Sequence, residues 1–188
     1  MTLFEFTFAL SAVVLGLALT HMAATVHKLL LAGNRVRWAI EPVLLACVVL
    51  LVIVSVWLGS WSARDNASVT VWQMLLAVAK LLTLYVAAAS CLPEPVGTEP
   101  IDLREHYDRT RILSFGALIV SLVLFLLHAI AVDGMPTPIT LWLLFMWFLY
   151  PVLYALLIFI RRRWFNILVL AFVFVFYSWR VGGDQLAA

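Results

Sequence analysis

Residues 39–61 read AIEPVLLACVVLLVIVSVWLGSW, with no charged side chain between Val43 and Trp61. A helix needs about 20 apolar residues, at ~1.5 Å rise each, to cross the hydrocarbon core of a bilayer. Lipid offers the backbone no hydrogen-bond partners, so such a run must satisfy its own backbone groups as a helix. We therefore expect a membrane-spanning helix over 39–61.

Five other segments have the same character. The expected spans are 3–26, 39–61, 71–92, 112–132, 139–160 and 164–179. The connections between them are brief and leave no room for a soluble domain. The expected fold class is therefore an all-α bundle of six transmembrane helices, in one membrane domain over residues 1–188.

The composition agrees with a protein dissolved in lipid. Of the 188 residues, 65% are hydrophobic and 12% are charged, and the mean hydropathy is +1.09. A soluble domain is nearer half apolar and a quarter charged. The net charge of +2 is too small to favour a polyanionic partner. We expect the lipid bilayer as the main partner and no nucleic acid.

The distribution of basic residues predicts the orientation, because cytoplasmic loops are enriched in Lys and Arg. The opposite side carries only Arg64 and Arg180, and Lys80 lies inside a span. We therefore expect the more basic loops to face the cytoplasm and both termini to lie on the non-cytoplasmic side. The nine basic residues of those three loops are Lys28, Arg35, Arg37, Arg104, Arg109, Arg111, Arg161, Arg162 and Arg163.

The longest connection, before the fourth span, contains the signal of a helix start. Asp102 and Glu105 form the Asp-x-x-Glu pattern of a capping box. Glu105 and Arg109 are spaced i,i+4, and Asp108 and Arg111 i,i+3, so these charges can pair. One interpretation is a solvated extension of the fourth span. The other is a docking helix for a partner or for lipid head groups, presenting Asp102, Glu105, Arg109 and Arg111.

Three short segments carry a family resemblance. Residues 102–111 read DLREHYDRTR and lead into an apolar helix, while 21–30 read HMAATVHKLL and 35–38 read RVRW. This pattern, spread over the first four spans, resembles small polytopic bacterial inner-membrane proteins of no assigned function. The resemblance implies a location in the bacterial inner membrane and implies no activity.

Lys80 is the sharpest functional signal. A charged side chain at mid-membrane costs about 2.5–3.5 kcal/mol on insertion scales, and such residues usually line a bundle interior or a hydrated path. No expected span contains Asp or Glu at the depth of Lys80. Gln73 shares a helical face with Lys80, and Thr83 lies beside that face. The stripe is either a site for an anionic or polar ligand or a lysine that snorkels or joins a satisfied network.

Two further groups are candidates. His21 and Glu41 can meet in the cytoplasmic half and accept a proton together, or make an ordinary interhelical hydrogen bond. Pro151 lies near the centre of the fifth span, where it frees a carbonyl and predicts a kink that acts as a hinge. Tyr150 and Tyr154 flank it, and kinked helices at mid-membrane form sites in transporters.

The leading interpretation is a small transporter or channel for an ion or a small polar or anionic solute. Because the bundle is thin, a homo-oligomer is expected if it conducts. The expected pathway residues are Lys80, His21, Glu41, Gln73, Thr83, Tyr150 and Tyr154, with Pro151 as the hinge.

The alternative is a scaffold or accessory subunit of a larger membrane complex. Four small residues spaced for close helix approach would serve it: Ala12, Gly16, Thr20 and Ala24. No nucleophile–base pair is evident, and the four His residues lack metal-ligand spacing. We therefore expect no enzyme activity, no metal and no cofactor.

Overall fold

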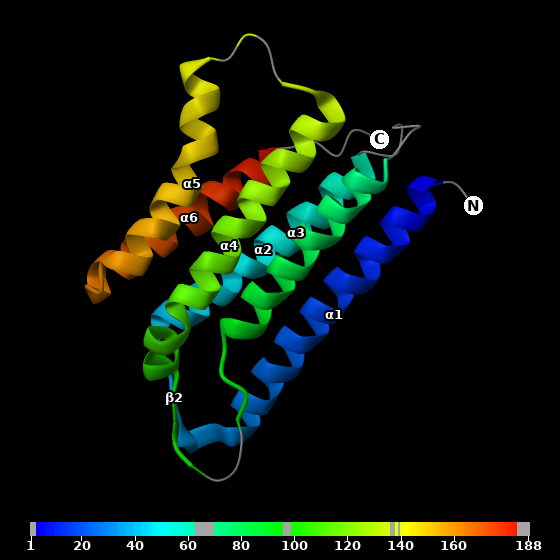
Figure 1. The fold of residues 1–188 in the computed structure, drawn as a ribbon. Coiled ribbons are helices and arrows are strands. Elements are labelled where there is room, and N and C mark those ends of the chain that lie inside the picture. The colour runs from blue at the N-terminus through cyan, green and yellow to red at the C-terminus, as the bar shows by residue number, and fades with distance from the viewer. Residues whose placement is uncertain (1–2, 63–69, 96–98, 136–137, 139, 184–188) are drawn as a thin grey trace.

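A computed structural model describes residues 3–62, 70–95, 99–135, 138 and 140–183 (Figure 1). Nearly all of these residues are helical, so the expected all-α fold is confirmed. Each expected span coincides with one helix. The helices are α1 (Leu3–Ala32), α2 (Ile40–Ser62), α3 (Val71–Ser90), α4 (Leu103–Asp133), α5 (Leu141–Phe159) and α6 (Arg163–Gly183).

Four of these helices have apolar segments long enough to cross a membrane. They are Thr7–Arg35, Ile40–Gly59, Val71–Ser90 and Leu103–Val132. The apolar parts of α5 and α6 are shorter, at no more than 17 residues each. Such a segment reaches about 26 Å, against a hydrocarbon core of ~30 Å. Length and composition therefore support a membrane protein with four clear candidate spans.

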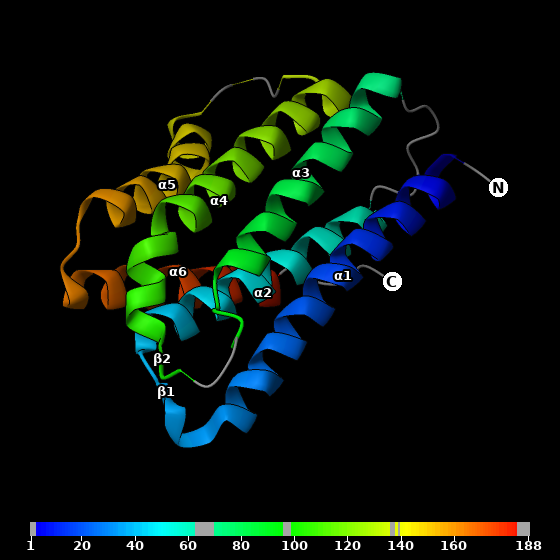
Figure 2. The ribbon, with the colours of Figure 1, turned by 60° about the horizontal axis from the view of Figure 1, so that its bottom comes forward.

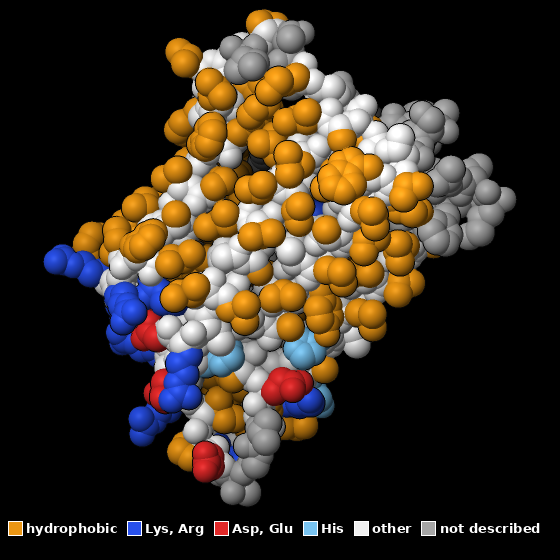
Figure 3. Space-filling view, in the orientation of Figure 1, with side chains coloured by type: hydrophobic (Ala, Val, Ile, Leu, Met, Phe, Trp, Pro, Cys, Tyr) orange, Lys and Arg blue, Asp and Glu red, His pale blue; other side chains and the backbone are white. Residues whose placement is uncertain are grey.

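The surface is also that of a membrane protein. Large apolar side chains point outward, including Leu141 (86% exposed), Phe159 (81%) and Val71 (77%). Figure 3 shows hydrophobic side chains over the middle of one face, with the charged and His side chains gathered at one end. A soluble monomer rarely exposes apolar patches of this extent. We call the charged end the basic end.

The helices pack as a bundle in which α5 and α6 attach to different neighbours. Helix α3 packs along α4 and α1, and α2 packs along α6. Helix α5 packs on α4 and has little contact with α6. In Figure 2, α1 and α5 lie on opposite flanks of the bundle with α3 and α4 between them.

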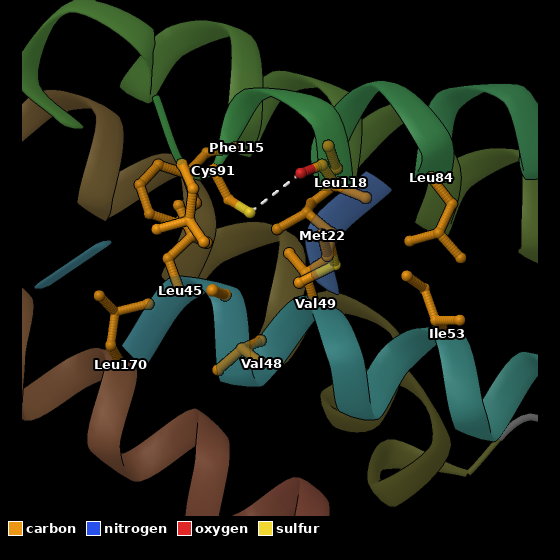
Figure 4. Packing of buried hydrophobic residues seen from close by; sticks show 14 of the residues in the cluster. Met22, Leu45, Val48, Val49, Ile53, Leu84, Cys91, Phe115, Leu118 and Leu170 are labelled. Carbon is orange, nitrogen blue, oxygen red and sulfur yellow. Dashed lines mark hydrogen bonds between the residues drawn. The ribbon is translucent and has the colours of Figure 1, made fainter. Parts of the chain in front are cut away.

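Helix α2 supplies the centre of the core. Its residues Leu45, Val49 and Ile53 are almost fully buried. Figure 4 shows these side chains directed towards the helices above α2, where Leu84 of α3 and Leu118 of α4 approach them. Shape-matched packing of this kind, rather than hydrophobic exclusion, holds helices together in lipid.

Two short strands join the basic-end loops. They are β1 (Val36–Arg37) and β2 (Ile101–Asp102), which pair in parallel. A turn of 3-10 helix, Gly33–Arg35, leads into β1. Gly33 has φ +54°, a left-handed conformation that glycine adopts without strain. The pairing was not expected from the sequence, because its two partners lie far apart in the chain.

Ser90 and Ser114 join α3 to α4 through hydroxyl groups 2.9 Å apart. Replacing each with Ala, singly and together, should reveal a coupling energy of about 0.6 kcal/mol, the usual size for such bonds in membrane proteins. Reversible unfolding in mixed micelles measures it. Thr110 donates only within its own helix, to the His106 carbonyl, so Thr110→Ala paired with Ser90→Ala should show no coupling. Equal coupling in both cycles would contradict the assignment.

Candidate functional site

Three separate loops meet at the basic end. The β1–β2 pair joins the loop after α1 to the loop before α4. The loop between α5 and α6 reaches the same place, because Arg163 of α6 pairs with Glu41 of α2. These are the three loops that the sequence analysis placed on one side of the membrane. Their basic side chains therefore share one end of the molecule.

Glu41 is a buried carboxylate near the start of α2. Its side chain is 3% exposed, and its Oε1 lies 3.1 Å from Nε of Arg163, which is half exposed. An acidic residue in the first turn of a helix also interacts favourably with the helix dipole. The other oxygen, Oε2, is buried and has no hydrogen-bond partner. One half of the carboxylate is therefore paired and the other is not.

Arg111 is the most deeply buried cation, at 2% exposure among the described residues. Its Nη2 donates to the carbonyl of Leu157 and, at 3.0 Å, to that of Ile160. These carbonyls end α5, where helix carbonyls lack intrahelical partners. Nη1 lies 3.8 Å from Asp108, as the i,i+3 spacing predicted. The docking-surface hypothesis is wrong for Arg111, because its guanidinium is buried inside the bundle and caps the end of α5.

The rest of the expected docking helix lies at the surface. Asp102 is the N-cap of α4 and accepts hydrogen bonds from the backbone of Arg104 and Glu105. The side chain of Glu105 pairs with Arg109 at 2.5 Å, and both are well exposed. The helix runs unbroken into the fourth span, as expected. Asp102, Glu105 and Arg109 thus lie at the start of an extension of α4, and docking by these three residues stays a prediction.

Two more polar side chains are buried at the basic end. Tyr107 of α4 is 2% exposed and Asn166 of α6 is 3% exposed. Tyr107 interacts electrostatically with both Arg111 and Glu41. We call Glu41, Tyr107, Arg111 and Asn166 the buried polar cluster. Sequence reasoning missed Tyr107 and Asn166, although an Asn in an otherwise apolar helix was an available signal.

Five atoms of this cluster are buried without a hydrogen-bond partner: Glu41 Oε2, Tyr107 Oη, Arg111 Nε, Arg111 Nη1 and Asn166 Oδ1. Leaving such a group unsatisfied costs about 1–3 kcal/mol. The cluster therefore needs polar partners beyond its own side chains.

Lys80 lies partly buried between α3 and α4. Its Nζ is 4.6 Å from the centre of the Phe125 ring of α4. Within the part of the chain that the structure describes, its ammonium makes no hydrogen bond or ion pair. A cation–π contact is worth about 0.5–2 kcal/mol, which is less than the ~2.5–3.5 kcal/mol cost of the charge at mid-membrane. The ring alone does not compensate the ammonium.

The other polar residues near Lys80 have structural partners. Gln73 forms a capping box with Thr70 at the start of α3, and its Nε2 donates to the Ala131 carbonyl of α4 at 2.7 Å. Thr83 donates to the Lys80 carbonyl, at 2.9 Å, inside its own helix. Gln73 and Thr83 therefore tie and cap helices in this structure, and neither contacts the Lys80 ammonium.

His21 and Glu41 are not brought together. The His21 ring lies against Tyr85 of α3, with ring centres 6.2 Å apart, while Glu41 pairs with Arg163. No ion pair or hydrogen bond joins His21 to Glu41. The expected proton-accepting pair is therefore wrong in this structure, because α1 presents His21 to α3 and α2 presents Glu41 to α6.

Tyr150 and Tyr154 belong to an aromatic cluster away from Lys80. Tyr154 stacks on Phe115 of α4, and Tyr150 contacts Phe176 and Tyr177 of α6. Both tyrosines are almost fully buried. Helix α5 contains Pro151, and Figure 1 shows that α5 bends partway along, as the kink prediction requires. Tyr154 thus lies at the α4–α5 interface and Tyr150 faces α6, whereas Lys80 lies at the α3–α4 interface.

No group of three His, Cys, Asp or Glu residues that could hold a metal occurs among the described residues. Cys47 and Cys91 are free thiols. The Cys91 side chain is almost fully buried and donates to the Ala88 carbonyl at 3.0 Å (Figure 4). Cys91 is thus a packing residue without thiolate reactivity.

Comparison of the chain with protein-family models, with curated proteins and with solved structures finds no match.

Replacing Arg111 with Met should lower the free energy of unfolding by about 2–3 kcal/mol, since charge-assisted bonds to two helix-end carbonyls are lost. Denaturation in mixed micelles, followed by circular dichroism, measures the loss. Arg109 lies on the same helix but is exposed and paired i,i+4. Arg109→Met should therefore change stability by no more than about 0.5 kcal/mol. Equal losses in the two variants would show that Arg111 does not cap α5.

Proposed function

We propose that the protein is a six-span protein of the bacterial inner membrane, with the basic end in the cytoplasm and both termini on the other side. The meeting of three basic loops at one end supports this topology, since each loop then returns the chain into the bilayer. Helices α5 and α6 are short, but tilt, local thinning and snorkelling accommodate a deficit of a few ångströms.

Single cysteines introduced into a protein that lacks Cys47 and Cys91 test this topology. A cysteine at exposed Arg162, between α5 and α6, should react with a membrane-impermeant maleimide only in inverted membrane vesicles. A cysteine at exposed Met135, after α4, should react only in intact cells with a permeabilised outer membrane. Labelling of both positions from one side would contradict the six-span arrangement.

For activity, we propose a small transporter or channel for an ion or a small anionic or polar solute. The observation that carries this proposal is the Lys80 ammonium, which sits between two apolar helices and, among the described residues, has the Phe125 ring as its one partner. An anion or a hydrated path beside Lys80 would supply the missing compensation of its charge. The Ser121 hydroxyl, which donates to the Lys80 carbonyl at 3.3 Å, adds a polar atom to the same interface.

The proposed path includes fewer residues than the sequence suggested. Gln73 and Thr83 have structural partners, and Tyr150 and Tyr154 pack in an aromatic core. The remaining path lies along the α3–α4 interface at Lys80. One bundle of this size offers few walls for an enclosed path, so we propose that it conducts as a homo-oligomer in which a second copy completes the path.

Reconstituted protein should conduct an anion in liposomes, and Lys80→Met should abolish that flux, because the variant loses the charge while keeping most of the side-chain length. Lys80→Arg should retain flux. Lys28, which pairs with Glu94 at the exposed basic end, provides the matched control, and Lys28→Met should conduct like the wild type. Stopped-flow anion-sensitive fluorescence measures the rates.

Flux that survives in Lys80→Met would exclude Lys80 from the path. Wild-type flux equal to that of empty liposomes would exclude transport itself. That second result would favour the alternative function, a scaffold or accessory subunit of a larger membrane complex. One observation supports this alternative. Part of the small-residue ridge of α1 is uncovered by the described residues: Thr20 and Ala24 are exposed, and a Cβ added at Gly16 would meet nothing within 4 Å.

A further inference from the structure

The buried polar cluster draws its side chains from the basic-end turns of α2, α4 and α6. Arg163 of α6 joins Glu41 of α2, and Asn166 follows Arg163 by one helical turn. Tyr107 and Arg111 are spaced i,i+4 on one face of α4. The four side chains of the cluster are nine-tenths or more buried, and five of their polar atoms have no hydrogen-bond partner, although Arg111 Nη1 lies 3.8 Å from Asp108. Buried polar groups of this kind are usually bridged by internal water.

The unpartnered atoms present both donors and acceptors. Arg111 Nε and Nη1 can only donate, Glu41 Oε2 and Asn166 Oδ1 accept, and the Tyr107 hydroxyl does either. An occupant must therefore accept from the guanidinium and donate to the carboxylate. Water does both, whereas a fully ionised anion has no hydrogen to donate to Glu41.

The orientation of the guanidinium also disfavours an anion. A carboxylate or phosphate binds arginine best through two parallel hydrogen bonds along one edge of the guanidinium. Both two-donor edges include Nη2, and Nη2 of Arg111 is already bonded to the carbonyls of Leu157 and Ile160. Arg111 is left with two single donors on separate edges. Single donors suit separate water molecules.

We propose that Glu41, Tyr107, Arg111 and Asn166 form an internal water-binding site that links α2, α4 and α6 at the basic end. The bound waters bridge the Glu41 carboxylate to the Tyr107 hydroxyl and the Arg111 guanidinium. The site is independent of Lys80 and of any transport along α3 and α4. It makes this end of the bundle polar inside, while the core around Leu45 and Phe115 stays dry.

Radiolytic hydroxyl labelling of the intact protein in lipid nanodiscs tests the site, because radicals generated from bound water modify the side chains beside it even when these are buried. Tyr107 should be oxidised several-fold faster than Phe115, with each rate divided by the intrinsic reactivity of its residue type. Phe115 is the matched control, since it lies on the same helix, is fully buried and contacts the Tyr107 ring edge-on.

Variants separate water from the alternatives. Asn166→Leu removes an acceptor and adds apolar volume, and should reduce Tyr107 oxidation towards the rate of Phe115. Arg109→Met changes an exposed residue of α4 outside the cluster, and should leave the oxidation rate nearly unchanged. Circular dichroism confirms that each variant is folded, and the wild-type ratio of Tyr107 to Phe115 decides the question if Asn166→Leu does not fold.

Two results would overturn the proposal. Equal normalised rates at Tyr107 and Phe115 in the wild type would mean that the cluster is dry. Suppression of Tyr107 oxidation by chloride or inorganic phosphate, relative to a buffer with only bulky organic anions, would assign the site to a small anion instead.

Discussion

The guanidinium of Arg111 is the interaction on which the placement of the last two helices depends. Helices α5 and α6 contact each other little beyond the packing of Tyr150 against Phe176 and Tyr177. Arg111 binds the carbonyls that end α5 to α4, and a few residues later Arg163 binds the start of α6 to Glu41 of α2. One buried cation and one buried carboxylate thus fix the turn between α5 and α6. The apolar faces of both helices then pack along neighbours that the turn has already positioned.

The helices could be predicted from the sequence because their cause is local. An apolar run of about 20 residues in lipid has no alternative to a helix, and the cap at Asp102 uses atoms within three residues of it. The β1–β2 pair and the burial of Arg111 have no such local cause. Arg111 binds backbone carbonyls 46 and 49 residues further along the chain. Every residue has a backbone carbonyl, so no residue type in the sequence identifies these acceptors. An arginine next to Asp108 and Arg109 therefore resembled any solvated helical charge.

The candidate site was predicted in part for a related reason. Helical spacing correctly put Gln73 and Lys80 on one face of α3, but it does not say which atoms cover that face. Gln73 donates a hydrogen bond to a carbonyl of α4, whereas the Lys80 ammonium contacts the Phe125 ring of α4. The expected contact between His21 and Glu41 is not formed. The sequence gives the depth of each residue in the membrane, but it does not give the neighbouring helix that each side chain faces. Tyr107 and Asn166 show their polar role only when three helices are assembled.

The unequal helix lengths have a consequence for the surrounding lipid. Helix α1 has 30 residues and reaches about 45 Å, whereas the apolar parts of α5 and α6 stay within 17 residues. Lipids beside α5 and α6 in a six-span arrangement therefore meet a shorter hydrophobic belt than lipids beside α1. Matching that belt requires the bilayer to thin on one flank only, at a modest free-energy cost for each ångström of mismatch. The protein would then deform its membrane asymmetrically, and copies that share their thinned flanks would lower the total deformation.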